Sequence, residues 1–231
     1  MFGRFKIVGV TLMVAGTMFL GVGGYTYIKT AEGAESLTAF SAAQDVKLSY
    51  NEQGQLVDRG ETAGADRIKA LLVEDWGYPV VASELNPDDP VVNTASEYMY
   101  QMATIAYHTL YTTVTVTVPE TVEYKGETFA AGEYEFVNEG RYWSDYDRAH
   151  PLEGPARAAI WTGTAHALIA ELGVGTVTAS ALQMGLGIAA IAAALGATLL
   201  LAGAGLIWAA RAAEAYERTS VRRGVAEPVL V

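Results

Sequence analysis

Two long stretches without a charged residue set what this chain can fold into. The first lies between Lys6 and Lys29 and has 22 residues, and the second lies between Glu171 and Arg211 and has 39 residues. An α-helix rises 1.5 Å per residue, so 22 residues reach roughly 33 Å, and the hydrocarbon core of a bilayer is about 30 Å thick. The sequence therefore predicts a membrane protein with two transmembrane α-helices, over residues 7–28 and 182–210.

The first stretch has a second interpretation, which is a cleaved signal peptide. Arg4 and Lys6 form a basic segment before it, and Ala31-Glu32-Gly33 after it has the small residues of a cleavage site. The apolar part of a signal peptide is usually about 7 to 15 residues long. The longer stretch found here favours a transmembrane helix.

The distribution of charge predicts the orientation. The N-terminal tail, residues 1–6, carries two cations, and the C-terminal tail, residues 211–231, carries four arginines and three glutamates. Residues 29–181 hold nine Lys and Arg against 23 Asp and Glu. Because cationic flanks stay on the cytoplasmic side, we expect both termini in the cytoplasm, the chain in the plasma membrane and residues 29–181 outside.

Small residues recur every seven positions in both stretches and predict how the two helices meet. They are Gly9, Gly16 and Gly23 in the first stretch, and Ala189, Gly196, Gly203 and Ala210 in the second. Such a series lets two backbones approach closely, so we expect an antiparallel helix hairpin with a shallow left-handed crossing. The alternative is that each helix packs on other subunits. Neither predicted span contains Asp, Glu, Lys, Arg or His, which disfavours an ion or proton path.

The segment between the spans, residues 29–181, is predicted to form one extracytoplasmic α+β domain with a small antiparallel sheet. Thr94-x-x-Glu97 is a capping box that begins a helix, and the alternation over residues 113–118 predicts a strand. Two further alternating runs with turns at Lys125-Gly126 and Ala131-Gly132 predict an antiparallel meander. A last helix is expected over residues 156–172 and is expected to end at Gly173.

Composition excludes several kinds of chemistry. The chain has no cysteine, so it has no disulfide, no thiolate nucleophile and no iron–sulfur cluster. With a net charge of -11 and no run of Lys or Arg, it lacks the positive charge that binding to nucleic acid requires. We predict no cofactor and no nucleic-acid partner.

The densest polar cluster outside the spans is Asp145, Asp147 and His150. Carboxylates and imidazole are metal ligands, and the same groups serve in acid and base catalysis. The cluster is also consistent with an ordinary salt-bridge network, because Arg141, Arg148 and Arg157 lie nearby in the sequence and would join the last strand to the following helix. We favour the salt-bridge network over a metal site.

The remaining candidates also have structural interpretations. His108, His150 and His166 are the histidines of the chain, and their spacing matches no metal-binding motif. Arg157 and Trp161 are four residues apart and are expected to form a cation–π pair on one helix.

Three functions are compatible with these features. The favoured one is a non-catalytic accessory subunit whose partners are the lipid bilayer and other membrane or envelope proteins. The alternatives are an extracytoplasmic module that senses a ligand or a metal, and an envelope-acting enzyme that uses Asp145, Asp147 and His150. In layout and in its acidic, alanine-rich composition the chain resembles membrane proteins of high-GC or halophilic prokaryotes, and no motif indicates a family.

Overall fold

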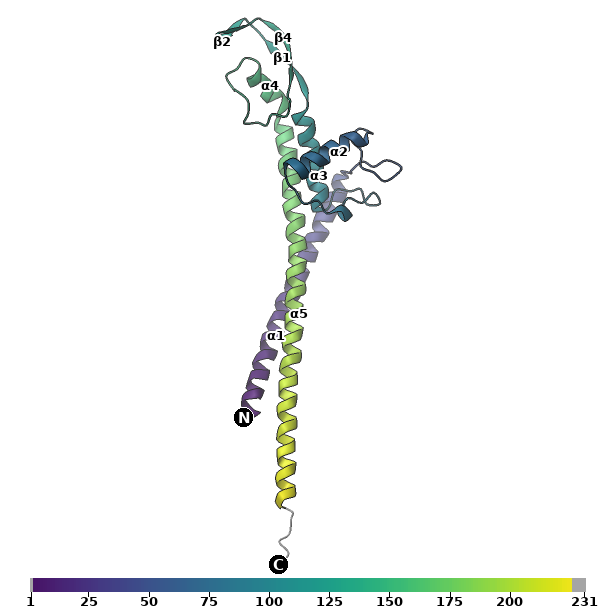
Figure 1. Ribbon diagram of the computed structural model, residues 1–231, viewed down its shortest axis with the longest axis vertical. Helices are drawn as coiled ribbons and strands as arrows, with labels where there is room; N and C mark the ends of the chain where they lie inside the picture. The colour runs from purple at the N-terminus through teal and green to yellow at the C-terminus, as the bar shows by residue number, and fades with distance from the viewer. Residues whose placement is uncertain (1, 226–231) are drawn as a thin grey trace, which may run out of the picture. The chain divides into compact units, whose positions relative to one another are not determined.

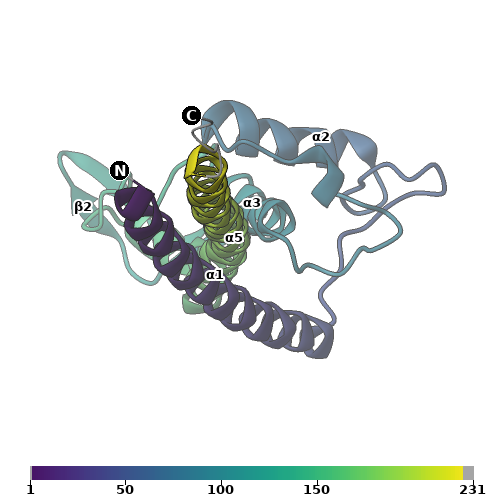
Figure 2. The same cartoon turned by 90° about the horizontal axis from the view of Figure 1, so that it is seen from below.

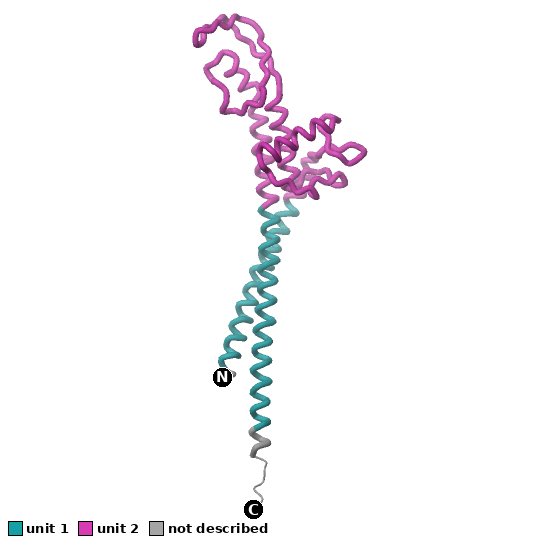
Figure 3. Tube along the Cα trace, viewed as in Figure 1, with its two compact units in different colours: residues 1–36, 181–231 teal, residues 37–180 magenta. Residues whose placement is uncertain are grey.

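The protein is mostly helical, with small antiparallel sheets between two long helices (Figure 1). The computed structural model describes residues 2–225, so residues 226–231 of the predicted C-terminal tail lie outside the described residues. Two compact units divide the chain (Figure 3). The first combines α1 up to Ser36 with α5 from Ala181 onward, and the second is Leu37–Ser180.

The two long helices are α1 (Phe2–Gln44) and α5 (Gly163–Val225). By length and composition each is able to cross a membrane. The limits of the membrane-embedded parts, residues 7–28 and 182–210, stay predictions. The predicted helix end at Gly173 is wrong, because α5 continues through this residue. A glycine inside a helix destabilises it by only about 1 kcal/mol, and residues 174–225 contain no proline that would end the helix.

The second unit contains a short helix pair. Helix α2 (Thr62–Ala70) continues into the π-helical turn η1 (Leu71–Asp75), where the N–H of Trp76 donates to the carbonyl of Leu71 at 3.0 Å. Gly77, with φ of 64°, follows the turn and ends it. Helix α2 packs against α3 (Ala95–Leu110), as both Figure 1 and Figure 2 show. A short 3₁₀ turn, η2 (Ala82–Glu84), lies in the connection between them.

The predicted capping box is confirmed at the start of α3. The backbone N–H of Thr94 donates to Oε2 of Glu97 at 2.9 Å, and the N–H of Glu97 donates to Oγ1 of Thr94 at 3.4 Å. The Glu97 side chain is buried, and burial raises the pKa of its carboxyl. This cap fixes the point at which the loop becomes helix.

Helix α3 supplies residues to two hydrophobic clusters. Its N-terminal half packs with α2 around Ile68 and Leu72, which are fully buried. Its C-terminal half packs around Leu110 with β1 and α4 (Glu153–Ile160). The helix is therefore the common wall of both cores.

The strand predicted over residues 113–118 is confirmed as β1 (Thr113–Val118), but the predicted meander is wrong. Strand β1 pairs with β4 (Gly132–Val137), and β2 (Val122–Tyr124) pairs with β3 (Glu127–Phe129). The strands form an interrupted hairpin closed at Lys125-Gly126, where φ is 50° and 88°. A two-residue reversal of this kind needs two successive positive φ values, which Ala131 disfavours, so β4 runs back along β1.

The last predicted helix is divided into two. Helix α4 ends at Ile160, and α5 begins at Gly163 after a short break. The Thr162 side chain stabilises the new start, because its Oγ1 accepts from the N–H of Ala165 at 3.1 Å. Trp161 lies at this break, as the residue that caps the end of α4.

Candidate functional site

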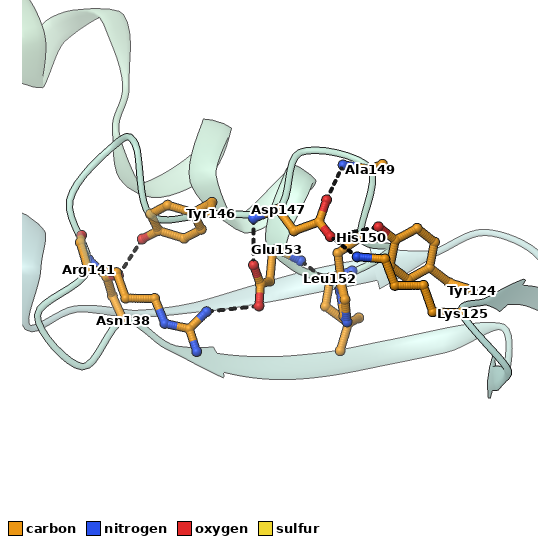
Figure 4. Close-up of polar contacts among 10 residues, drawn as sticks. All are labelled: Tyr124, Lys125, Asn138, Arg141, Tyr146, Asp147, Ala149, His150, Leu152 and Glu153. Atoms are coloured by element: carbon orange, nitrogen blue, oxygen red, sulfur yellow. Dashed lines mark hydrogen bonds and ion pairs between the residues drawn. The ribbon is translucent and has the colours of Figure 1, made fainter.

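Asp145, Asp147 and His150 lie in the loop between β4 and α4. Figure 4 shows Asp147 and His150 with their contacts. Two turns fold this loop. The N–H of Asp145 donates to the carbonyl of Tyr142 at 2.9 Å, and the N–H of His150 donates to the carbonyl of Asp147 at 3.1 Å. The three side chains share a short loop; Asp147 and His150 both contact Tyr124, whereas Asp145 contacts its own turn.

Asp147 is bound to the tip of the hairpin. Its Oδ2 accepts from the hydroxyl of Tyr124 at 2.6 Å and from Nζ of Lys125 at 2.7 Å, and its Oδ1 accepts from the N–H of Ala149 at 3.1 Å. The hydrogen bonds from Lys125 and then Tyr124 hold the pKa of the Asp147 carboxyl well below its usual range. The same hydrogen bond raises the pKa of Lys125. A carboxylate whose pKa is lowered in this way is a weak proton acceptor, so it is poorly matched to general-base catalysis near neutral pH.

His150 is bound to the start of α4. Its Nδ1 accepts from the N–H of Leu152 at 3.1 Å and from the N–H of Glu153 at 3.3 Å. An accepting Nδ1 carries no proton, so in the neutral ring the proton is on Nε2. The edges of Tyr124 and Phe129 contact the ring, with centroids at 5.4 and 5.0 Å. His150 thus links the hairpin to α4.

Asp145 closes its own turn. Its Oδ2 accepts from the N–H of Tyr142 at 2.8 Å, and its Oδ1 accepts from the Ser144 hydroxyl at 3.3 Å. Within residues 2–225, no three His, Asp or Glu side chains are grouped so that they could hold a metal ion. The loop therefore brings Asp145, Asp147 and His150 near each other in the chain without directing them at a shared point.

Asn138 is a residue that the sequence analysis missed. Its side chain is fully buried, and its Nδ2 donates to the carbonyls of Thr109 at 2.8 Å and Arg141 at 3.2 Å. The hydroxyl of Tyr146 donates to its Oδ1, and burial raises the pKa of Tyr146. A single asparagine after a strand is a weak signal in a sequence, since most such residues lie in exposed turns.

The ion pairs in the described residues differ from the predicted network, because Asp147 pairs with Lys125 and Arg141 pairs with Glu153. Nη1 of Arg141 lies 3.0 Å from Oε1 of Glu153, which joins the end of the hairpin to α4. Oε2 of Glu153 accepts from the N–H of Asp147 at 2.7 Å. Arg157 instead stacks on Trp143, with its guanidinium carbon 3.2 Å from the ring centroid, so the predicted pair with Trp161 is wrong.

The other two histidines have separate surroundings. Nε2 of His108 lies 2.9 Å from Oδ1 of Asp58, and the ring of His166 contacts Trp143 with centroids 4.8 Å apart. Neither contact involves His150. No protein-family model matches this chain, and no curated protein or solved structure is significantly similar to it.

The second candidate site is the contact between α1 and α5 in the first unit. A Cβ atom on Gly9 would lie 2.7 Å from the carbonyl oxygen of Gly203, and one on Gly16 would lie 2.7 Å from that of Gly196. A Cβ atom on Gly23 would lie 3.1 Å from the carbonyl oxygen of Ala189. Each step of seven residues forward along α1 meets a residue seven positions earlier on α5. The two helices therefore run antiparallel, with their small residues face to face.

This contact continues beyond the glycines that the sequence indicates. Thr30 follows Gly23 by seven residues and is buried. It packs against Gly185 of α5, because a Cβ atom on Gly185 would lie 2.5 Å from Oγ1 of Thr30. Near the other end, Nζ of Lys6 lies 2.6 Å from Oε2 of Glu214. The sequence pattern did not include Thr30, because it consisted of glycine and alanine positions alone.

Proposed function

We propose that the chain is a non-catalytic accessory subunit, anchored in the plasma membrane by α1 and α5, that docks on a larger membrane or envelope complex. The observation that carries the anchoring is the apolar surface of these helices. The faces not used in the glycine contact leave large side chains uncovered, among them Ile7, 68% exposed, and Leu201, 75% exposed. Burying such a side chain stabilises by about 1.5–3 kcal/mol, and lipid would bury the whole set.

Charge supports the proposed orientation. Cations flank the first apolar stretch on its N-terminal side, and the segment between the helices carries the excess of acidic residues. Tyr25, Tyr27 and Trp208 are exposed near the ends of the apolar stretches, where amphipathic aromatic rings anchor helices at the membrane interface. These features support the proposal that both termini lie in the cytoplasm and residues 29–181 outside.

The docking part of the proposal rests on exposed aromatic side chains in the second unit. Tyr111, Tyr142 and Trp143 are exposed large residues, and aromatic side chains contribute strongly to protein interfaces. Arg157 stacks on Trp143 and donates from Nε to its carbonyl at 3.2 Å, which holds this surface in place. A fixed aromatic surface loses little side-chain freedom when a partner binds.

The first test is identification of what remains bound to the native protein. The full chain is extracted in mild detergent through a C-terminal tag, and its partners are identified by mass spectrometry. One stoichiometric membrane or envelope protein is expected, and its amount falls with Trp143→Ala but not with Val137→Ala, which alters another exposed side chain. Recovery of the chain alone, or as a homo-oligomer, contradicts the proposal.

The orientation has its own test, because the chain has no cysteine of its own. Single cysteines are introduced at the exposed positions Gly3 and Glu120, and intact cells are treated with a membrane-impermeant maleimide. Glu120→Cys is expected to react in intact cells, and Gly3→Cys only after permeabilisation. The reverse pattern, or equal reaction of both, would refute the orientation.

A further inference from the structure

A cavity in the second unit has no role in the proposed docking. It lies between the last turns of α1, helix α3 and the early turns of α5, and its volume is about 520 Å³. Pockets that bind small molecules have about 300–1,000 Å³. Its apolar walls include Leu37, Phe40, Ile105, Leu168, Leu172 and Val174.

Tyr98 of α3 forms the floor of the cavity and connects the other two helices. Its hydroxyl is hydrogen-bonded to Oγ of Ser41 on α1 at 2.7 Å, and both groups are buried. Its ring lies on Gly175 of α5, where a Cβ atom would come within 2.5 Å of Cδ1. The hydroxyl of Tyr98 is thus hydrogen-bonded, and its ring lines the cavity while it packs on Gly175.

The distribution of polarity indicates the class of ligand. Phe40, Leu168 and Val174 line the cavity and remain exposed, so the apolar surface reaches its mouth. Polar lining groups include Gln44 and Glu171, which are exposed. A ligand with a long apolar body and a polar end matches this arrangement, because its body covers the walls while its end stays in water.

The lining helices are also the ones that continue into the apolar stretches. Leu37 follows residue 28 by nine positions in α1, and Thr178 precedes residue 182 by four positions in α5. We propose that this cavity binds an acyl chain of a bilayer lipid with a neutral or zwitterionic headgroup; this inference rests on the proposed membrane anchoring.

The headgroup follows from charge. Glu171 lines the cavity, and residues 29–181 hold 23 acidic against nine basic residues. An anionic phosphate ester without a compensating cation would be repelled by this segment, whereas a neutral or zwitterionic headgroup would not. Phosphatidylcholine is therefore the appropriate probe, and phosphatidylglycerol, with the same acyl chains, is the comparison.

The test uses the full chain in phosphatidylcholine vesicles that contain a phosphatidylcholine with a photoactivatable acyl chain. After irradiation, mass spectrometry is expected to find the label on the cavity residues. Val174→Trp fills the mouth and should lower this labelling about tenfold. Val177→Trp is the matched control, because Val177 lies on the same helix, is 69% exposed against 66% for Val174, and does not line the cavity.

Each outcome has a defined meaning. Labelling of the cavity that is lost with Val174→Trp and kept with Val177→Trp supports the proposal. Labelling confined to residues 7–28 and 182–210, labelling equal in both variants, or stronger labelling from phosphatidylglycerol overturns it. Failure of the anchoring is detected separately, as release of the chain from membranes by alkaline carbonate, and the same lipid in detergent micelles then still tests the cavity itself.

Discussion

The two compact units of this protein are held together in opposite ways. In the first, α1 and α5 approach through positions that have almost no side chain, such as Gly16 against Gly196. In the second, large side chains such as Ile68 and Leu110 fill two cores, and buried polar groups such as Asn138 are hydrogen-bonded. One unit brings its two backbones close together at glycines, and the other depends on large side chains packed in cores.

This difference in packing agrees with the surroundings proposed for each unit, which are lipid for the first and water for the second. In lipid, apolar side chains gain nothing by leaving the solvent, so helices associate through close backbone packing and the surface stays apolar. In water, burial of apolar side chains is the main favourable term, and polar groups that are buried with them need partners. The two units should therefore respond differently to the same kind of substitution, and the following predictions test this.

The largest effect is expected for Leu72→Ala in the second unit. Leu72 is 0% exposed, and its truncation should destabilise the folded unit by about 2–5 kcal/mol. The measurement is the thermal unfolding midpoint of the full chain in detergent, followed by tryptophan fluorescence. Val73→Ala, at a neighbouring position that is 41% exposed, is the control and should change the midpoint little.

Gly16→Leu should separate the helices of the first unit. The new Cβ would lie 2.7 Å from the carbonyl oxygen of Gly196, and overpacking of this kind destabilises by about 1–3 kcal/mol. Cysteines at Gly23 and Ala192, whose Cβ atoms would be 3.3 Å apart, report the contact as a disulfide. The disulfide should be lost with Gly16→Leu and retained with Gly21→Leu, since a Cβ on Gly21 meets nothing within 4 Å.

These two experiments together can break the comparison. Leu72→Ala should leave the disulfide yield unchanged, and Gly16→Leu should leave the unfolding signal of the second unit unchanged. If either variant altered both measurements, the units would be one cooperative structure, and their different packing would not reflect two separate environments.

A smaller effect is expected for Glu97→Ala. The substitution removes the carboxylate that accepts from the N–H groups of Asn93 and Thr94, so the start of α3 should lose about 1–2 kcal/mol. Amide hydrogen exchange of the first turn of α3 measures the loss. Glu97→Gln is the control, because glutamine also completes a capping box and should retain most of the protection.

The smallest effect is expected for Asp147→Asn, and it depends on pH. The pKa of Asp147 is lowered in the folded protein, so its contribution to stability is complete above its unfolded pKa of 3.8 and declines as the pH falls toward the folded value. The difference in unfolding midpoint between the wild type and this variant should therefore be larger at pH 7 than at pH 3. An unchanged difference would mean that the contacts to Tyr124 and Lys125 do not stabilise the loop.

Much of the fold was predictable where it depends on neighbours in the chain. The capping box of Thr94 and Glu97 and the alternation over residues 113–118 both operate within a few residues, and the structure confirms both. The predicted meander is wrong because strand order depends on where the chain reverses, and of its two predicted turns Lys125-Gly126 has the positive φ values of a tight turn whereas Ala131 does not. In the candidate site, Asp145, Asp147 and His150 were identifiable from the sequence, but the groups that they contact were not.

What the sequence by itself determined is the pair of long apolar helices and the heptad of small residues, because hydropathy and helical period are properties of consecutive residues. Only the tertiary structure decided that Asp147 contacts the hairpin tip, that Arg157 stacks on Trp143, and that Asn138 is buried. These contacts join residues that are far apart in the sequence. Arg157 and Trp143 are 14 positions apart, and Asn138 and Thr109 are 29 positions apart. Which side chains meet over such distances is fixed by how the cores pack, and a local pattern does not contain that information.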